Sequence, residues 1–386
     1  MTQYSLDRIF VSLLVLLFLM LVPQGAMRQA RAQVSGKQLL QQLIEGARKE
    51  GQIDWFPVPD LKTEDVRAVA QVFNKRFGLN IRLNAEVAGN IAAVFSKALM
   101  ESKSGLSPTF DVMYGPDHRG VLLWQNGGVD RIDNWEALLR EISPEAYAVR
   151  DVVSPVDLAG YAFLWGTRVK AMNYNTRLIS EADLPKTHVE LGDPKYKGMY
   201  PLPPFITEAE YGPLIYPKDR WLEVVRSWSA LGPPIIAYRA SVTRMLLGEF
   251  KFMPSNAYYV WEVKAEDPKA PIGLGFFKDF TAISYIFHVV RKGAKHPNAA
   301  KLFTLWATSP EANAIFESGK FGGITPNLAL GTGPVSSEIK KKLGERGVKT
   351  VSWFDSKQTL QALLWYDTTE GGQYAKELSR AQTGRK

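Results

Sequence analysis

Ile53-Asp54-Trp55-Phe56 decides the fold, because this short apolar stretch opens a repeating pattern of strands and helices. It stops at Pro57 and Pro59, and proline does not continue the interior of a strand. Apolar residues then recur at helical spacing from Val66 to Phe77, until Gly78 ends the pattern. The sequence therefore predicts a strand, a loop and an amphipathic helix in succession.

The same pattern repeats and then ends on a third strand. Apolar and polar residues alternate from Leu79 to Val87, helical spacing returns from Ile91 to Leu99, and Phe110–Tyr114 is a further apolar run. A chain that alternates strands and helices in this way forms a mostly parallel sheet, whose ligands bind beyond the carboxyl ends of the strands. We therefore expect an α/β fold with its binding site at that edge.

Two loops leave this edge of the predicted sheet, and each carries an aspartate. Asp60 lies in the loop that begins at Pro57, and Asp117 lies in the loop from Gly115 to Arg119. A single loop aspartate is usually a turn former or a helix cap. Because the loops of neighbouring parallel strands open on the same cleft, both aspartates are candidates for the binding site.

A second candidate lies far along the chain, in Pro254-Ser255-Asn256-Ala257-Tyr258-Tyr259-Val260-Trp261. Successive strand residues face opposite sides, so Tyr258 and Tyr259 reach one ligand only at a bend or at a strand end. Pro254 and Asn256 favour such a bend. The alternative is an ordinary aromatic strand with one tyrosine in the core and one on the surface, and spacing alone favours that alternative.

The chain between these candidates predicts a second domain inserted into the first. Residues 160–175 are aromatic and apolar without a helical period, which predicts paired strands that cross from one domain to the next. A tract rich in proline and turn residues follows, and then helical patterns near 220–231 and 241–249. Residues 272–290 return as a long apolar strand region, and the chain from Gly331 onward is helical and polar.

The N-terminus carries the pattern of a secretory signal. An apolar run from Ile9 to Val22 precedes Ala30-Arg31-Ala32, an A-x-A cleavage site that predicts a mature chain beginning at Gln33. The run is too short to span a membrane comfortably, which disfavours a retained anchor. The chain has 386 residues, no cysteine and a formal net charge of +8. We therefore expect a two-domain protein of the periplasm, whose modest positive charge aids solubility and favours anionic ligands.

Sequence motifs of the common catalytic and nucleic-acid-binding classes do not occur. The chain has no phosphate-binding glycine loop, no H-E-x-x-H pair and no G-x-S-x-G turn. Its four histidines are far apart, with no ligand partner at metal-binding sequence spacing, and no basic stripe alternates with stacking aromatics. We therefore expect a binding protein rather than an enzyme, with no nucleic acid among its partners.

Five pieces of the sequence carry a family resemblance. They are the signal segment, Glu50–Ile53, Leu184–Thr187 followed by Asp193–Gly198, Leu247–Glu249, and Lys295–Phe303. As a set they resemble the extracellular solute-binding proteins of ABC importers, and the ferric-ion-binding type in particular. The resemblance covers essentially the whole mature chain. It implies the type II periplasmic-binding fold, in which crossing strands join two α/β lobes and the ligand cleft lies between them.

The resemblance also implies partners and a division of the chain. The partners are an ABC permease and its ATPase at the inner membrane, together with a small-molecule or metal ligand, and we expect a monomer. The chain divides into a signal peptide (1–32), the first part of lobe 1 (33–160), lobe 2 (161–279), and the second part of lobe 1 with the C-terminal helices (280–386).

The family's metal site gives roles to residues of this chain. In ferric-ion-binding proteins, two consecutive tyrosines that follow a glycine–glutamate pair supply phenolate oxygens to Fe³⁺, and Tyr258-Tyr259 follow Gly248-Glu249 in the matching place. Ferric ion is a hard cation whose charge stabilises a phenolate. The family adds a histidine and a glutamate from the first lobe. Here Asp60 stands approximately in the histidine's place and Asp117 in the glutamate's, so this sequence departs from the family's pattern.

A neighbouring segment resembles the family's anion site. Gly166-Thr167-Arg168 is similar to a segment that holds a small anion beside the metal through backbone N–H groups, and a guanidinium suits that role. The alternative is an ordinary strand turn with a surface arginine.

Two other functions stay open. Relatives with this fold also bind phosphorylated, sulfonated or carboxylated organic molecules, and here Arg168 and Arg119 would hold the anionic group. Aromatic rings would cover the apolar part: Trp55, Phe56, Trp165 and Tyr258. A secreted hydrolase or other enzyme is the third class. No cofactor is expected, because Fe³⁺ would be the transported ligand.

Overall fold

The computed structural model describes residues 35–58, 61–86, 90–206, 209–319, 321 and 323–385, without the side chains of 116–118 and 156. The predicted signal segment lies outside these residues. Within them, no helix is both long enough and apolar enough to cross a membrane.

The beginning of the described chain follows the predicted alternation. The elements are β1 (Gln52–Phe56), α4 (Thr63–Phe77), β2 (Arg82–Ala85), α5 (Ile91–Ser104) and β3 (Val112–Pro116). Gly78 ends α4 as predicted, in the left-handed conformation that glycine adopts without strain (φ 60°). β1 pairs in parallel with both β2 and β3, so the carboxyl ends of these three strands meet at one edge of the sheet.

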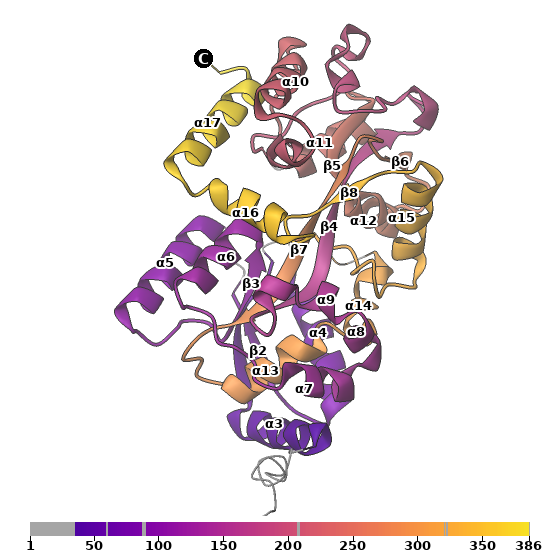
Figure 1. Ribbon diagram of the computed structural model, residues 1–386. Coiled ribbons are helices and arrows are strands. Elements are labelled where there is room, and N and C mark those ends of the chain that lie inside the picture. The colour runs from indigo at the N-terminus through magenta and orange to yellow at the C-terminus, as the bar shows by residue number, and fades with distance from the viewer. Residues whose placement is uncertain are drawn as a thin grey trace, which may run out of the picture.

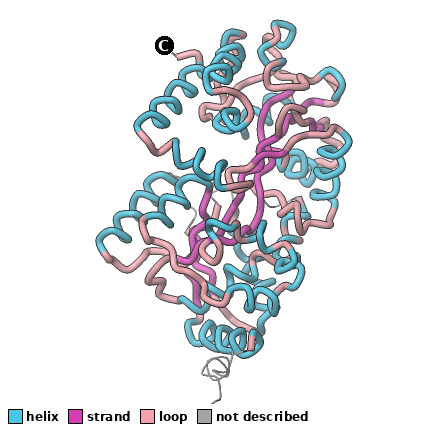
Figure 2. The backbone as a smooth tube through the Cα atoms, viewed as in Figure 1, coloured by secondary structure: helices cyan, strands magenta, loops and turns pink. Residues whose placement is uncertain are grey.

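One sheet runs through the length of the molecule, in the order β2-β1-β3-β7-β4-β5 (Figure 2). β4 (Ala162–Asn175) and β7 (Thr281–Val290) are its longest strands, and they pair in antiparallel orientation. β3 pairs with β7 at one end, while β5 (Phe252–Asn256) and β6 (Ile272–Gly275) pair with β4 at the other. The β4–β7 pair therefore joins the two ends of the molecule (Figure 1), and the predicted mixed α/β architecture is confirmed.

The structure differs from the sequence-based expectation at these crossing segments. Residues 162–175 form one long strand, and not paired strands, because all of its partners come from distant parts of the chain. Residues 272–290 are correspondingly two strands, β6 and β7, that pair with different parts of β4.

Helices surround the two ends of this sheet (Figure 1). We call the part around β1–β3 the lower half; its further helices are α3 (Gly36–Glu50), α6 (Asp117–Gln125), α7 (Trp135–Ile142), α8 (Pro144–Ala148), α9 (Arg150–Val153), α13 (Pro297–Trp306) and α14 (Pro310–Asn313). We call the part around β5 and β6 the upper half; its helices are α10 (Lys218–Ala230), α11 (Tyr238–Leu246), α12 (Tyr258–Glu266), α15 (Pro334–Glu345) and α17 (Thr369–Thr383). Short connecting elements are η1 (Val156–Leu158), η2 (Glu181–Asp183), η3 (Glu190–Gly192), η4 (Pro194–Tyr196), η5 (Ala209–Leu214), η6 (Phe316–Ser318), β8 (Thr350–Val351) and α16 (Lys357–Trp365).

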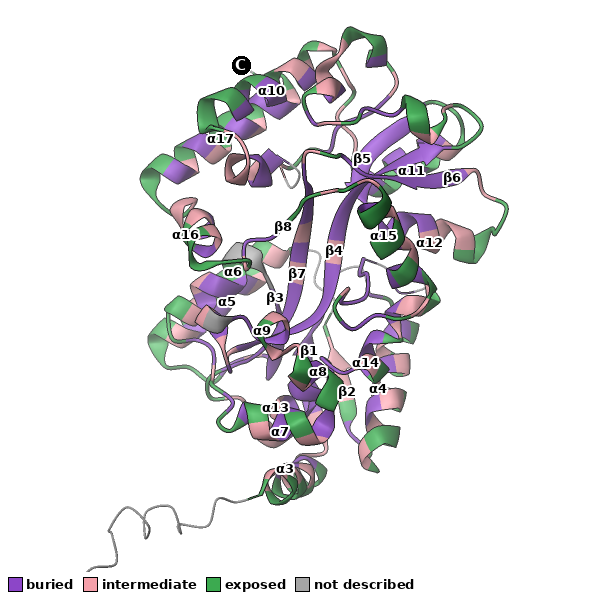
Figure 3. Ribbon diagram, turned by 45° about the vertical axis from the view of Figure 1, so that its right-hand side comes forward, coloured by how far each residue is buried: buried purple, intermediate pink, exposed green. Residues whose placement is uncertain are grey.

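The apolar core of the described residues consists of two clusters, and the strands β4, β5, β6 and β7 are almost entirely buried (Figure 3). The smaller cluster lies in the upper half and includes Tyr258 and Tyr259 from α12. Val335, Ile339 and Leu343 of α15 pack into the same cluster. The C-terminal part of the chain thus contributes to the core of the upper half. The predicted lobe boundaries stay a prediction.

The last helices connect the two halves on one side of the sheet. α16 packs on α6, and α17 lies along α10 (Figure 1). Directly after α16, the Tyr366 hydroxyl donates a hydrogen bond to the Glu210 carbonyl at 2.9 Å. Within α17, the Tyr374 hydroxyl donates to the carbonyl of Lys218, the first residue of α10, at 2.9 Å. We call residues 357–383 the C-terminal strap, because they pass from the lower half to the upper half.

Candidate functional site

The two predicted tyrosines lie where a strand becomes a helix. β5 ends at Asn256 and α12 begins at Tyr258, so the strand end that the sequence required is present. Both Tyr258 and Tyr259 are 5% exposed, and their ring centroids lie 4.3 Å apart. The alternative with one tyrosine in the core and one on the surface is wrong, because successive side chains of a helix diverge by about 100° and not by the half-turn of a strand.

A charged pair borders the two phenols. Arg239 of α11 donates from Nη1 to Glu262 Oε1 at 2.7 Å, and Glu262 is one helical turn beyond Tyr258. Burial alone would lower the pKa of the Arg239 guanidinium, yet the hydrogen bond to Glu262 and the nearby phenols of Tyr259 and Tyr258 raise it above its ordinary value. The phenols therefore lie beside a permanent positive charge.

Asn256 is a further candidate, which the sequence analysis did not assign to the site. It is 4% exposed, and its side-chain Oδ1 is buried without a hydrogen-bond partner among the described residues. Lys170 of β4, 8% exposed, lies directly opposite it in the β4–β5 register. Buried polar atoms are nearly always paired, so an unpaired acceptor just before two phenols is a group that a ligand would satisfy. The feature of the sequence that could have identified Asn256 is a polar residue at the last position of a buried strand.

The segment predicted to bind an anion, Gly166-Thr167-Arg168, forms hydrogen bonds with Gly323 and Thr325 instead. The backbone N–H of Thr167 donates to the Thr325 carbonyl at 2.9 Å, and the Thr325 N–H returns a bond to Thr167 at 2.7 Å. Arg168 Nε donates to the Gly323 carbonyl at 2.8 Å. A Cβ on Gly166 would lie 2.4 Å from Ile324 Cγ2, so glycine is required for this close approach. Because the Thr167 N–H is already bonded, the predicted anion site now depends on the guanidinium of Arg168.

The predicted residues of the lower half have different outcomes. Phe56 is fully buried, and its ring packs at 5.3 Å from Phe110 and 5.6 Å from Tyr114. It therefore fills the core of the lower half. Asp117 is the first residue of α6, directly after β3, but its side chain lies outside the described part of the structure, as does Asp60. Their proximity to the tyrosines stays a prediction.

A cavity of about 440 Å³ separates α4 of the lower half from α12 of the upper half. Four of its nine lining residues are acidic and one is a lysine, and the acidic residues include Asp65 from α4 and Glu262 from α12. Burial raises the pKa of the Asp65 carboxyl above its ordinary value, and the charges of Glu64 and Glu262 add to this effect. Carboxylates from the two halves thus face the same space, close to the helix that begins with the tyrosines.

One cluster brings together residues of the types that bind metal ions. Ligand atoms of Asp54, Asp111 and His296 all lie within 4.8 Å of one another, although the residues are far apart in sequence. The Asp111 carboxylate accepts hydrogen bonds from the backbone N–H groups of Asp54 (2.8 Å), Lys295 (2.7 Å) and His296 (3.1 Å), and it bonds His296 Nδ1 at 2.7 Å. This carboxylate therefore fastens β1 to α13. Asp54 is the middle residue of β1, and Asp111 directly precedes the first residue of β3.

A family comparison identifies the type of protein to which this site belongs. The sequence profile of bacterial extracellular solute-binding proteins matches residues 68–342, which is more than half of the 386-residue chain. Among curated proteins, no sequence matches this chain.

Solved structures share the fold at low sequence identity. Iron-bound HitA from Pseudomonas aeruginosa is 19% identical, with a TM-score of 0.56 over 77% of this chain and 99% of HitA. Apo ferric ion-binding protein A from Pasteurella haemolytica is 13% identical, with a TM-score of 0.60 over 86% of this chain and 98% of that one. A periplasmic thiamin binding protein is 13% identical, with a TM-score of 0.61 over 86% and 96%. These likenesses confirm the two-lobed periplasmic-binding fold.

Proposed function

Because this chain belongs to the family of bacterial extracellular solute-binding proteins, we propose that it is the periplasmic component of an ABC importer and that its cargo is ferric iron. In this proposal the protein captures the ion between its halves and delivers it to a membrane permease, which an ATPase drives. The family is one of solute-binding proteins and not a class of enzymes.

The observation that carries the iron proposal is the adjacency of Tyr258 and Tyr259. Their rings lie 4.3 Å apart, both are nearly buried, and both come from the first turn of one helix. Two phenolate oxygens from neighbouring residues suit a hard trivalent cation, and a site shielded from water strengthens their attraction to it. Among the structures that share this fold, HitA was solved with iron bound.

The surrounding charges support the same cargo. The Arg239 guanidinium lies beside the phenols and would interact favourably with the phenolate oxygens of an iron-bound site. The acidic cavity between α4 and α12 adds negative charge where the two halves meet. A cation that enters between the halves therefore gains favourable interactions with both.

The alternative cargo is an organic anion. The same fold is used by a periplasmic thiamin binding protein, so the fold does not select a metal. Arg168 and Lys170 would then hold an anionic group. In that case iron would not bind, and Arg168→Ala would abolish binding of the organic ligand.

Titration with ferric citrate tests the proposal. The parent protein should take up iron with a visible absorption band from ferric phenolate, and Tyr258→Phe and Tyr259→Phe should each lose most of the affinity while they keep the packing of the ring. Tyr374→Phe is the matched control, since it removes a hydroxyl on α17 at a cost of about 1 kcal/mol in stability and should leave iron binding unchanged. A parent protein that binds no iron, or a double Tyr→Phe variant that binds iron normally, would reject ferric iron as the cargo.

A further inference from the structure

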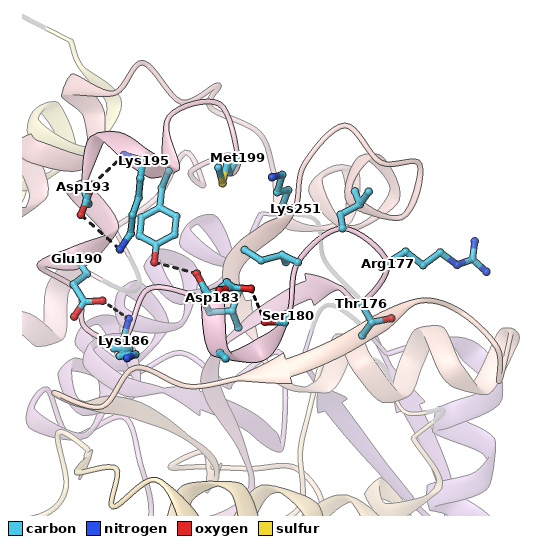
Figure 4. Close-up of a pocket in the computed structure, with 15 residues that line it drawn as sticks. Thr176, Arg177, Ser180, Asp183, Lys186, Glu190, Asp193, Lys195, Met199 and Lys251 are labelled. Carbon is cyan, nitrogen blue, oxygen red and sulfur yellow. Dashed lines mark hydrogen bonds and ion pairs between the residues drawn. The ribbon is translucent and has the colours of Figure 1, made fainter.

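A large cavity lies outside the candidate ligand site, at the end of the upper half. It has a volume of about 880 Å³ and begins at Thr176, where β4 ends. Lysine, arginine and carboxylate side chains surround it (Figure 4). Tyr258 and Tyr259 do not line this cavity, so it is separate from the proposed iron site.

Three basic side chains of the cavity are available to a partner. The lining contains Arg177, Lys186, Lys195 and Lys251. Lys195 lies 3.7 Å from Asp193, but the other three have no carboxylate at ion-pair distance among the described residues. Lys251 is also partly buried, so its charge is held in place more firmly than that of a freely exposed lysine.

The carboxylates of the cavity are already used by the protein itself. Asp183 accepts a hydrogen bond from the Ser180 hydroxyl at 2.6 Å. Glu190 accepts from the Lys186 backbone N–H at 2.9 Å, and Asp193 accepts from the Lys195 backbone N–H at 3.0 Å. These bonds hold the short helices η2, η3 and η4 in position. These bonds orient the carboxylates but leave their charge in place. Apart from the Lys195–Asp193 pair, three basic side chains then face the two carboxylates of Asp183 and Glu190, so the lining has a small net positive charge.

The basic groups are spread along the cavity and do not converge on one point. Figure 4 shows Lys186 and Lys195 toward one end, Arg177 at the other end, and Lys251 between them. A small anion needs several donors around one spot, whereas a row of separate charges fits an extended chain that carries several carboxylates. Two exposed leucines adjoin this row: Leu178 is 42% exposed and Leu247 is 75% exposed.

The walls of the cavity are formed by sequence pieces that the ligand site does not use. Leu184–Thr187 and Asp193–Gly198 carry part of the family resemblance, and both contribute to the lining. The Tyr196 hydroxyl of the second piece donates to the carbonyl of Asp183, the residue directly before the first piece, at 3.1 Å. A Cβ on Gly248 would lie 3.8 Å from Leu178 Cδ1, which places the third piece, Leu247–Glu249, beside the cavity. These pieces therefore build one surface of the upper half.

We propose that this cavity is a docking site for an extended acidic segment of a partner protein. The row of Arg177, Lys251 and Lys186 attracts the carboxylates, and Leu178 and Leu247 provide apolar contact beside them. The identity of the partner rests on the proposed function: if the protein delivers its cargo to a membrane permease, that permease is the partner. Separated charges of this kind act mainly on the rate of encounter and on orientation, so the contact is sensitive to salt.

Fluorescein-labelled hexaglutamate is a direct probe of the cavity. Its anisotropy should rise on addition of the parent protein at low ionic strength and should fall back in about 0.5 M salt. Lys186→Ala combined with Lys251→Ala should bind about tenfold more weakly, because two of the charges in the row are removed. Hexalysine of the same length should not bind.

The matched control removes the same charge elsewhere. Lys97 and Lys103 lie on the exposed face of α5 in the lower half, and Lys97→Ala combined with Lys103→Ala should leave hexaglutamate binding unchanged. An equal loss in both double variants, or no binding by the parent protein, would overturn the docking site. Circular dichroism should show that both variants are folded, as expected for side chains outside the core.

The docking-site proposal and the iron proposal can be rejected independently of each other. Ferric citrate titration of the Lys186→Ala and Lys251→Ala variant should match that of the parent protein, because the cavity does not include the tyrosines. Loss of hexaglutamate binding with normal iron binding supports the docking site. Hexaglutamate binding by a protein that takes up no iron supports the docking site and rejects only the cargo.

Discussion

The carboxylate of Glu50 caps helix α13, because its Oε2 accepts a hydrogen bond from the backbone N–H of Ala299 at 2.7 Å. Its Oε1 accepts from the Asn298 side chain at 2.6 Å. Two of the five pieces that carry the family resemblance, Glu50–Ile53 and Lys295–Phe303, therefore meet in the fold. A negative charge at a helix N-terminus also interacts favourably with the helix dipole.

Glu50→Gln should therefore lower the free energy of unfolding by about 1 kcal/mol, and Glu50→Ala by about 2 kcal/mol, since alanine loses both the charge and the cap. Urea denaturation measures both values. Glu45→Ala is the control, because Glu45 is exposed on α3, the helix that ends at Glu50, and its side chain bonds only Gln41. Equal effects at the two positions would mean that the cap contributes nothing.

Arg291 forms a buried ion pair with Glu101. It is 1% exposed, lies 3.3 Å from Glu101 and donates to the carbonyls of Ala98 (3.0 Å) and Gly128 (3.1 Å). Arg291→Met should lower the free energy of unfolding by about 3–5 kcal/mol, because it leaves a buried carboxylate without its partner. Combining it with Glu101→Met should recover part of that loss.

The control for Arg291 is a surface pair. Arg220 and Glu223 are both exposed and 3.1 Å apart, so Arg220→Met should cost less than about 1 kcal/mol. Chemical denaturation of the parent protein, of Arg291→Met, Glu101→Met and Arg220→Met, and of the double variant gives the comparison. A double variant as unstable as the sum of its two single variants would show that the charges do not interact.

Because the ring of His288 is buried, we expect the free energy of unfolding to fall at acid pH. The ring is fully buried and stacks on Trp165 at 4.5 Å, and burial lowers the pKa of His288 to about 3. In the unfolded chain the pKa is about 6.5. Between these values the unfolded chain binds a proton that the folded protein does not. The stability that the neutral His288 contributes to the folded protein is therefore fully present above about pH 6.5 and is lost as the pH falls toward 3. At pH 5 this loss lowers the free energy of unfolding by about 2 kcal/mol.

His288→Phe removes this titration and keeps an aromatic ring in the stack. Other titrating groups affect both proteins alike, so the difference between the two stability curves isolates His288. From pH 7 to pH 5 the variant should lose about 2 kcal/mol less than the parent protein in urea denaturation. Parallel curves over this range would contradict the low pKa.

Gly166→Ala should destabilise the region where the halves join. The added methyl group would overlap Ile324, at 2.4 Å from its Cγ2, and forced overlap in a packed core costs about 1–3 kcal/mol. Shortening the neighbour, in Gly166→Ala with Ile324→Ala, should relieve much of the strain, although the Thr325 carbonyl stays close at 3.1 Å. Ile324→Ala alone empties a buried site, so the double variant should lose less stability than the sum of the two single variants. Thermal denaturation of the three variants tests this coupling, and losses that simply add would refute it.

The local part of the fold could be predicted from the sequence. Apolar periodicity and Gly78 were enough to place β1, α4, β2, α5 and β3, because each is determined by residues close in the chain. The adjacency of Tyr258 and Tyr259 required one further fact, the end of β5 at Asn256, and spacing alone favoured the wrong alternative.

Contacts between distant residues could not be predicted. Thr167 bonds Thr325, and α17 packs on α10, through pairings that no local pattern encodes. Phe56 shows the same limit, because its position just before a predicted binding loop gave no sign that Phe110 and Tyr114 enclose its ring. The Asp54, Asp111 and His296 cluster likewise exists only after β1, β3 and α13 have come together.

The C-terminal strap has a kinematic consequence for the two halves. They are joined at the β4–β7 pair, beside which the segments leading into and out of α15 also cross, and, away from it, at the turn at 366–368 between α16 and α17. Two bodies held at two separate places rotate freely only about the line that passes through both. Any other rotation must pull the Tyr366 hydroxyl from the Glu210 carbonyl. The strap therefore restricts free rotation between the two halves to one axis, the line through the β4–β7 pair and the turn at 366–368.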